Sequence, residues 1–333
     1  MPEADTPPLR VRHLSVRFRT GSGVVRAVDD VSFSVPRGHT LGVVGESGAG
    51  KSTLALAILG LHDPARTTVS GEVRIGEQDI VGMPEPELRH LRGRRVALIV
   101  QNPLSALHPA YTAGRQIGEA YRAHHPAATR AQARRRAIEM LYLVGIPDPA
   151  DRVDRYPHEF SGGMRQRIMI AMALVNEPSL VIADEPTTAL DVTVQAQILD
   201  LLQDLQRSRN SALVLITHNI DVVRRLADHV LVMYAGRAVE TGAVDVVTRR
   251  PGHPYTEGLL ASVPSMDAPT DAELASIPGS PPNLADLPTG CAFHPRCRYA
   301  ELTAGRSRTE VPRLRPAGEP GHLVACHLAG HPR

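Results

Sequence analysis

One short stretch limits the fold of this chain more than any other. The residues GESGAGKS at 45–52 fit the pattern G-x-x-x-x-G-K-[ST] without a gap. An apolar run at 41–44 precedes them, and residues 53–59 have the composition of a helix. A strand that feeds a glycine turn at a helix N-terminus gathers backbone N–H groups around one anionic pocket. We therefore expect a phosphate-binding loop, made by Gly45, Glu46, Ser47, Gly48, Ala49, Gly50, Lys51, Ser52 and Thr53.

Lys51 is the only lysine of the chain, because all its other basic residues are arginine. A slender ammonium group fits between phosphates, whereas a planar guanidinium would clash there. We expect Lys51 to reach the β- and γ-phosphates of a nucleotide and the Ser52 hydroxyl to ligate Mg²⁺.

Composition excludes several classes of protein. The 333 residues have a formal net charge of only +2, which gives no case for a nucleic-acid partner. No run approaches the length of a membrane span, and the N-terminus has prolines and acidic residues instead of the apolar core of a signal peptide. Three cysteines suit a reducing compartment. We expect a globular chain of two or more domains that stays in the cytoplasm.

The N-terminal part has the alternation of β-structure. We expect antiparallel strands at 14–18 and 31–35, around a turn at 20–23. Phe18 lies in the first of these strands and has two interpretations: it stacks on an adenine, or it faces the core. Burial statistics favour the core, and the base contact stays open.

Beyond the loop, strands alternate with helices. We expect strands at 71–76 and at 95–100, and the second of these ends at Gln101. Open α/β sheets bind ligands at the C-terminal ends of their strands, so Gln101 is a site candidate. From about 102 to 176 the chain becomes rich in alanine and arginine, which predicts a helical insertion. Its expected helices are 111–124 and 129–144.

The end of this insertion has a second anion-binding pattern. Ser161, Gly162 and Gly163 open a further helix that runs to Leu174. A serine before the first turn caps the helix, and the N-terminal amide groups there accept an anion.

Two apolar strands then end in polar side chains. Asp184 and Glu185 follow the strand at 180–183, where Asp184 can hold Mg²⁺ through water and Glu185 can orient an attacking water. His218 follows the buried strand at 212–217. A lone histidine is more often structural, but at the same sheet edge a contact with the γ-phosphate is credible.

These segments occur in the order typical of one family. They are the phosphate loop, Gln101, Ser161 to Gly163, Asp184 with Glu185, and His218. Over about residues 9–250 the sequence resembles the ATPase subunits of ATP-binding cassette (ABC) transporters. The resemblance implies an α/β fold, a P-loop NTPase cassette of the ABC type, with a RecA-like core, an antiparallel β subdomain and a helical subdomain at about 102–176. One departure is that Phe160 and Met164 flank the Ser-Gly-Gly triplet, where the family usually has leucine and glutamine.

The resemblance also implies how the residues work. In this family two ATPase subunits pair head to tail, so that each nucleotide lies between one phosphate loop and the partner's Ser-Gly-Gly helix. Because both chains bind the γ-phosphate, ATP favours the closed dimer and hydrolysis releases it. Asp191 would couple the two sites across the interface. The residues assigned to one site are Lys51, Ser52, Gln101, Asp184, Glu185 and His218, with Ser52, Gln101 and Asp184 around Mg²⁺.

The last part of the chain narrows the substrate class. Residues 252–260, a proline-rich stretch at 278–288 and the sequence GCAFHPRC at 290–297 resemble the tail of oligopeptide and dipeptide importer ATPases. The resemblance predicts an ATPase domain at 1–250 and a C-terminal domain at 251–333. It implies uptake of oligopeptides, dipeptides or related solutes such as nickel chelates, powered at the cytoplasmic face of the membrane. The implied partners are a second ATPase subunit, identical or paralogous, two membrane permease subunits and an extracytoplasmic solute-binding protein.

All three cysteines lie in this tail, at Cys291, Cys297 and Cys326. Relatives often carry a fourth, which would fall near Ala304. One interpretation is a structural iron–sulfur or zinc site, whose fourth position is taken by water or by a histidine such as His294, His322 or His327. The other is three reduced, part-buried thiols.

Two other functions remain open from the sequence. One is a soluble ABC ATPase of translation or repair, although such proteins usually have two cassettes or a long coiled-coil insertion. The other is a catalytically weak member of an ATPase heterodimer, against which Glu185 and His218 argue.

Overall fold

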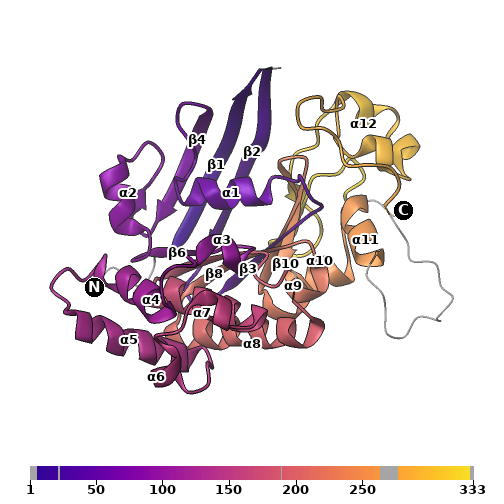
Figure 1. Ribbon diagram of the computed structural model, residues 1–333. Coiled ribbons are helices and arrows are strands. Elements are labelled where there is room, and N and C mark those ends of the chain that lie inside the picture. The colour runs from indigo at the N-terminus through magenta and orange to yellow at the C-terminus, as the bar shows by residue number, and fades with distance from the viewer. Residues whose placement is uncertain (1–5, 22, 189, 263–276, 331–333) are drawn as a thin grey trace. The chain divides into compact units, whose positions relative to one another are not determined.

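The computed structural model of the chain describes residues 6–21, 23–188, 190–262 and 277–330 (Figure 1). The chain forms two compact units. The first unit consists mainly of Arg74–Val214, together with Val35–His39, and the second consists of Arg10–Ser34, Thr40–Val73 and the chain from Leu215 onward. The boundaries of the units fall within strands, among them β4 (Thr67–Ile75) and β8 (Ala212–Thr217).

The second unit is built on strands. They are β1 (Leu9–Thr20), β2 (Gly23–Val35), β3 (Thr40–Val44), β9 (His229–Tyr234), β10 (Arg237–Ala243), β11 (Arg315–Pro316) and β12 (Leu323–Val324). In the sheet that contains β3, β3 pairs in parallel with β9, and β9 pairs antiparallel with β10. The strands predicted at 14–18 and 31–35 are confirmed as an inner part of the longer β1 and the C-terminal part of the longer β2, which are neighbours in one sheet.

Short helices complete this unit. They are α1 (Lys51–Ile58), α9 (Ile220–Leu226), α10 (Val244–Arg249), α11 (Pro254–Ala261), α12 (Arg306–Thr309) and the 3-10 helices η2 (His294–Arg296) and η3 (Ala300–Thr303). All of β3 is buried. Val44 belongs to a core that also includes Tyr234, Tyr255 and Phe293, so the tail and the strand before the phosphate loop share one hydrophobic core.

The first unit contains most of the helices. They are α2 (Glu85–Leu91), α3 (Pro103–Ala106), α4 (Ala113–Arg122), α5 (Arg130–Leu143), α6 (Pro149–Arg152), α7 (Gly162–Leu174), α8 (Val192–Arg209) and the 3-10 helix η1 (Pro157–Glu159). Its strands are β6 (Val96–Ile99), which pairs in parallel with β7 (Leu180–Asp184), and β5 (Gln78–Asp79), which pairs with the end of β4.

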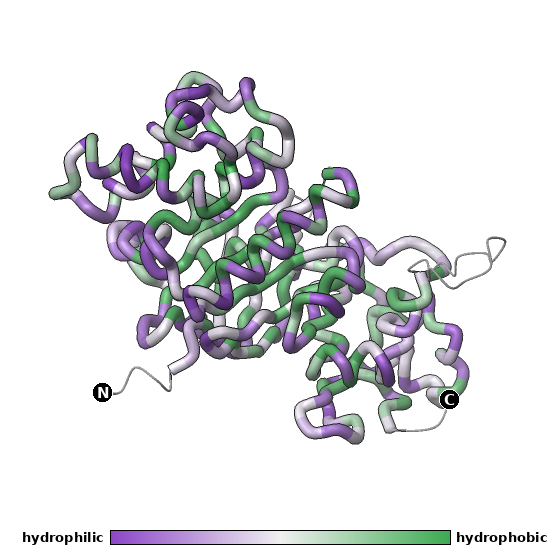
Figure 2. Tube along the Cα trace, turned by 90° about the horizontal axis from the view of Figure 1, so that it is seen from below, coloured by the Kyte–Doolittle hydropathy of each residue, from purple (hydrophilic) through white to green (hydrophobic). Residues whose placement is uncertain are grey.

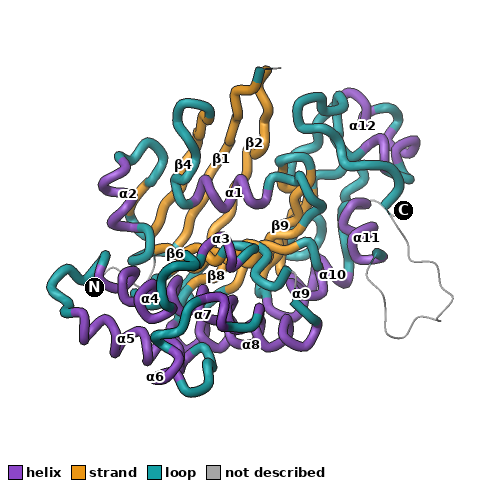
Figure 3. The backbone as a smooth tube through the Cα atoms, in the orientation of Figure 1, coloured by secondary structure: helices purple, strands orange, loops and turns teal. Residues whose placement is uncertain are grey.

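Polar residues set where these helices begin. Thr112 caps α4, and Thr129 forms a capping box with Gln132 at the start of α5. The helices α4, α5 and α7 pack against one another, and Figure 3 shows them as neighbours. The helices predicted at 111–124 and 129–144 are therefore confirmed, each slightly shorter than predicted.

Hydrophobic residues follow the buried elements. Figure 2 shows the hydrophobic stretches of the trace along the inner strands and the hydrophilic ones in the outer loops. Among the described residues, no helix combines the length and the apolar composition that a membrane span needs.

The end of the tail returns to the sheet of the second unit. β12 pairs antiparallel with β10, with Glu240 opposite Val324. Glu240 is fully buried, and His322, just before β12, places Nε2 2.7 Å from its Oε1. The same carboxylate accepts the backbone N–H groups of Gly252 (2.6 Å) and His253 (2.9 Å). One buried carboxylate thus fixes both the start and the end of the tail, and the predicted division at residue 250 stays a prediction.

This pair predicts a dependence of stability on pH. The hydrogen bond to Glu240 raises the pKa of His322 above its usual value of 6.5. A raised folded-state pKa stabilises the protein below the usual value, and this contribution is lost as pH rises through the raised pKa. We expect His322→Gln to lower the free energy of unfolding by about 1–2 kcal/mol near pH 6, and by less at higher pH.

Urea unfolding at a series of pH values checks this expectation. His90→Gln, on the exposed face of α2, is the matched control and should follow the wild type. A constant difference between His322→Gln and the wild type across the range would contradict it.

Candidate functional site

The phosphate loop joins β3 to α1 in the second unit. Gly50, the last residue before the helix, has a φ of 100°. A Cβ at this position would lie 2.3 Å from the carbonyl oxygen of Ala27, so only glycine allows this approach. Gly50 brings no capping side chain, and the first backbone N–H groups of α1 are therefore available to an anion.

Lys51 is the first residue of α1 and is 94% buried, since its relative exposure is 6%. Its Nζ donates to the carbonyl oxygens of Gly45 (2.7 Å) and Glu46 (3.0 Å). The ammonium group is thereby held over the loop, at the position from which a lysine of this motif reaches phosphate oxygens.

The neighbouring loop residues differ in exposure. Ser52 is exposed and Thr53 is half-buried. The Thr53 carbonyl lies 3.0 Å from Nε2 of His62, and the edge of the His62 ring meets the half-buried Phe18 at a centroid distance of 5.5 Å. Phe18 is thus packed on one side, and its stacking on a base stays a prediction.

His218 also belongs to the second unit. It is exposed and directly follows β8, as the sequence predicts. The next residue, Asn219, caps α9 by accepting the backbone N–H groups of Asp221 and Val222. His218 therefore lies between the end of a buried strand and a capped helix, and its backbone position is fixed from both sides.

The first unit brings Gln101 and Glu185 together. Gln101 follows β6, and its Nε2 donates to Oε2 of Glu185 at 3.2 Å. The Thr188 hydroxyl donates to the same oxygen at 2.8 Å. Both donors orient the carboxylate of Glu185, and the sequence had not pointed to Thr188.

The backbone of Glu185 is unusual. It has a φ of 48°, a left-handed conformation that residues other than glycine seldom adopt. Asp184 is the last residue of β7, so the chain turns sharply between the two acidic residues. Such strain gathers at functional sites, and here it supports separate roles for Asp184 and Glu185.

A buried glutamine supports this turn. Gln166 lies in α7 with an exposure of 1%, and its Nε2 donates to the carbonyl oxygen of Pro186 at 2.6 Å. Pro186 follows Glu185, so α7 holds the turn directly. Gln166 is polar, whereas the other buried residues of α7 are apolar. This difference is the only sign of the contact in the sequence.

The Ser-Gly-Gly triplet begins α7, as predicted. The Ser161 hydroxyl accepts the backbone N–H of Met164 at 3.3 Å and caps the helix. A Cβ on Gly163 would lie 2.6 Å from Cγ1 of Val194 in α8, whereas one on Gly162 would meet only Leu190 at 3.9 Å. Gly163 is thus needed for the packing of α7 against α8.

Asp191 has a local structural task. It is the N-cap of α8, and its Oδ1 accepts the backbone N–H of Val194 at 2.9 Å. The coupling of two sites by Asp191 stays a prediction.

The tail contacts the phosphate loop, which the sequence did not predict. Both carboxylate oxygens of Glu46 accept hydrogen bonds from Arg296, at 2.6 and 3.0 Å. The backbone N–H of Glu46 donates to the hydroxyl of Tyr255 at 2.7 Å. Burial raises the pKa of Tyr255, so its hydroxyl stays protonated.

The structure does not support the predicted metal site at Cys291, Cys297 and Cys326. Among the described residues, which include all three, no group of His, Cys, Asp and Glu side chains is arranged to hold a metal ion. Burial raises the pKa of Cys291 to about 11. The candidate fourth ligands are engaged elsewhere: His322 with Glu240, and His294 and His327 with the carbonyl oxygens of Cys291 and Glu310.

Comparison with known proteins places these features in a family. Residues 28–188 match the family model described as ABC transporter, and residues 239–302 match the one described as Oligopeptide/dipeptide transporter, C-terminal region. The dipeptide transport ATP-binding protein DppD of Escherichia coli (strain K12) is 48% identical over 97% of this chain and 98% of its own length. The chain belongs to the ABC transporter ATP-binding family.

Two further relatives are also named as ATP-binding proteins of peptide transport. The oligopeptide transport ATP-binding protein OppD of Bacillus subtilis (strain 168) is 48% identical over 88% of this chain and 82% of its own length. A putative peptide import ATP-binding protein of Brucella abortus (strain 2308) is 48% identical over 92% of this chain and 96% of its own length.

Solved structures agree with this assignment. The dimeric, post-hydrolysis ATP-binding cassette MJ0796, bound to ADP and Pi, has a TM-score of 0.64 and 26% identity, over 71% of this chain and 98% of its own. CbiO1 from Clostridium perfringens, part of an ABC transporter complex, has a TM-score of 0.62 and 26% identity, over 74% of this chain and 92% of its own. The predicted ABC-type α/β cassette with a peptide-importer-type tail is thus confirmed.

The residues of this ABC cassette fit ATP with Mg²⁺. The close approach at Gly50 leaves a cradle that a Cβ would fill, and the start of α1 offers backbone N–H groups to phosphate. The Ser52 hydroxyl in the second unit and, separately, the Gln101 amide oxygen and the Asp184 carboxylate in the first unit are oxygen donors of the kind that Mg²⁺ prefers.

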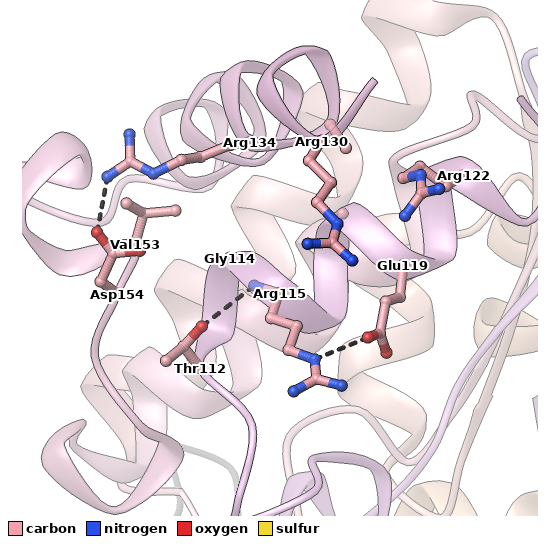
Figure 4. A pocket seen from close by; sticks show the side chains of 11 residues that line it. Thr112, Gly114, Arg115, Glu119, Arg122, Arg130, Arg134, Val153 and Asp154 are labelled. Atoms are coloured by element: carbon pink, nitrogen blue, oxygen red, sulfur yellow. Dashed lines mark hydrogen bonds and ion pairs between the residues drawn. The ribbon is translucent and has the colours of Figure 1, made fainter. Parts of the chain in front are cut away.

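A separate hollow lies in the helical part of the first unit, between α4, α5 and the residues after α6 (Figure 4). Its volume is about 450 Å³, and its lining includes Arg115, Arg122, Arg130 and Arg134. Arg115 pairs with Glu119 and Arg134 with Asp154. Arg122 donates to a backbone carbonyl, and Arg130 has no hydrogen bond or ion pair with any residue that the structure describes. The hollow therefore has a net positive charge.

The glycine turn gives a direct test of the loop. We expect Gly50→Ala to destabilise the protein by about 2–4 kcal/mol and to abolish ATP binding, because Cβ would meet the Ala27 carbonyl in an unfavourable φ region. Gly48→Ala is the matched control, since Gly48 also has a positive φ (79°) but nothing lies within 4 Å of its added Cβ. Its expected cost is only about 1–2 kcal/mol.

Urea unfolding and ATP titration of both variants check this expectation. Equal losses of stability in the two variants would show that backbone conformation alone, and not the approach to Ala27, requires the glycine.

Proposed function

We propose that this chain is the ATP-hydrolysing subunit of an importer that takes up oligopeptides or dipeptides. The observation that carries the proposal is one chain with a phosphate loop, an oriented Gln101–Glu185 pair and a tail matching the oligopeptide/dipeptide transporter region. The names of DppD and OppD, which refer to dipeptide and oligopeptide transport, support the substrate class. Related small solutes such as nickel chelates belong to the same proposal.

The roles of the residues follow from their chemistry. The amide groups of residues 45–53 and the Lys51 ammonium bind the phosphates, and bound Mg²⁺ neutralises charge on them. Glu185, oriented by Gln101 and Thr188, holds and polarises the attacking water. His218 contacts the γ-phosphate.

A second ATPase subunit, identical or paralogous, completes each site. The first amide groups of α7, behind Ser161, Gly162 and Gly163, bind the γ-phosphate held by the partner. Because the γ-phosphate then contacts both subunits and ADP lacks it, ATP has the differential affinity that closes the dimer. MJ0796, similar to this chain, was solved as a dimer.

Two membrane subunits and an extracytoplasmic solute-binding protein are the further partners. We place the docking of the membrane subunits on the helical insertion and the surface after Gln101, at the cytoplasmic face of the membrane. The positive hollow between α4 and α5 supports this, because Arg130 is available to an acidic side chain of a docking segment.

Reconstitution tests the transport function. We expect the chain, its partner ATPase and the membrane subunits in proteoliposomes to hydrolyse ATP several-fold faster with peptide-loaded binding protein than with the empty protein. Lys51→Ala, which lacks the phosphate-binding ammonium, should abolish both the basal and the stimulated rate. If nickel chelates stimulated ATP hydrolysis and peptides did not, the proposed peptide substrate would be wrong. The assignment of the chain as an ATPase would still stand.

Replacing the water-orienting carboxylate tests the hydrolytic step. We expect Glu185→Gln to bind ATP with unchanged affinity and to release phosphate at least about 100-fold more slowly, because an amide cannot polarise the water. Glu87→Gln, an exposed position of α2, is the matched control and should keep the wild-type rate. Phosphate release by Glu185→Gln at the wild-type rate would remove Glu185 from the mechanism.

A further inference from the structure

Glu46 of the phosphate loop is held from three directions within the second unit. Its carboxylate binds Arg296, its backbone N–H donates to Tyr255, and its carbonyl oxygen accepts Nζ of Lys51. Arg296 and Tyr255 belong to the tail, while Lys51 is the residue that reaches the phosphates. A single loop residue thus connects the tail to the phosphate-binding ammonium.

Arg296 is built into its position. Its side chain is 5% exposed, and Nε donates to the carbonyl oxygen of Pro278 at 2.8 Å. The guanidinium lies 5.9 Å from the ring centroids of Tyr234 and of Phe293. The two-pronged contact with Glu46 fixes the carboxylate in one plane, and a buried pair of this geometry loses much if one partner is removed.

Tyr255 is fixed equally firmly. It is fully buried in α11, and its ring packs at centroid distances of 4.6 Å from Tyr234 and 5.5 Å from Phe293. Its hydroxyl is therefore a rigid acceptor for the Glu46 N–H. The peptide groups on both sides of Glu46 cannot turn without breaking a contact with the tail or with Lys51.

The negative charge of Glu46 opposes nucleotide binding unless a positive charge compensates it. A carboxylate within a phosphate loop repels the polyphosphate that the loop binds. Arg296 neutralises this carboxylate from the side of the tail. Because the pair is largely shielded from water, the neutralisation is stronger than that of an exposed ion pair.

We propose that the tail sets the affinity of the phosphate loop for nucleotide, with Arg296 and Tyr255 as positioning residues that act through Glu46. The proposal rests on the ATPase function proposed above. It gives the tail a task at the nucleotide site, in addition to any role in substrate class.

Titration of the full-length protein with Mg·ATP, together with steady-state kinetics, tests this inference. We expect Arg296→Met to raise Kd and KM for ATP about tenfold with a much smaller change in kcat, since a carboxylate is left unneutralised in the phosphate-binding loop. Adding Glu46→Gln to Arg296→Met should recover most of the lost affinity. Arg298→Met is the matched control, because Arg298 pairs with Glu257 at 2.9 Å on the surface and should leave ATP affinity unchanged.

The double variant separates electrostatics from folding. A purely structural role of Arg296 predicts that the double variant binds ATP no better than Arg296→Met, and that result would overturn the inference. Tyr255→Phe keeps the ring and removes only the acceptor, so it should weaken ATP binding about three- to tenfold while urea unfolding shows a folded protein. Wild-type affinity in Tyr255→Phe would remove Tyr255 from the proposal, and wild-type affinity in Arg296→Met would overturn it. Failure of the wild-type protein to bind Mg·ATP would instead overturn the proposed function.

Discussion

Backbone amide groups at the start of α1 need a partner, and much of the second unit keeps them in place for an anion. The buried strand β3 delivers the chain to the loop, and the absence of a side chain at Gly50 lets it pass the carbonyl of Ala27. Lys51 and Glu46 then tie the loop to itself and to the tail. The phosphate site is thus formed by backbone N–H groups. The side chains keep the loop in the conformation that presents these groups.

The sequence predicts those parts of the site whose cause is local. A glycine turn between an apolar run and a helix, or acidic residues after a buried strand, have the same meaning wherever they lie in the chain. For this reason the glycine turn before α1, the capped start of α7 and the end of the strand at the acidic pair Asp184 and Glu185 are found where the sequence places them. The strands β1 and β2 extend beyond their predicted bounds, since pairing continues past the apolar residues that identify a strand.

The parts that the sequence does not reveal depend on contacts between distant residues. Glu46 and Arg296 are 250 positions apart, and no pattern along the chain relates them. Gln166 is similar, because a polar residue in a helix does not reveal which distant backbone group it supports, here the carbonyl group of Pro186. For the cysteines the sequence leaves two interpretations open, a metal site or three reduced thiols. The arrangement of the described side chains does not support the metal site.

Glu240 joins the first and last parts of the tail, since it binds the amide groups of Gly252 and His253 as well as the ring of His322. When both ends of a segment bind the same residue, here Glu240, the chain between them can change in length or composition. The strand β10, which contains Glu240, then stays the same. The chain between these ends can therefore vary, provided that the residues that contact the nucleotide loop and the core residues Tyr255 and Phe293 are retained.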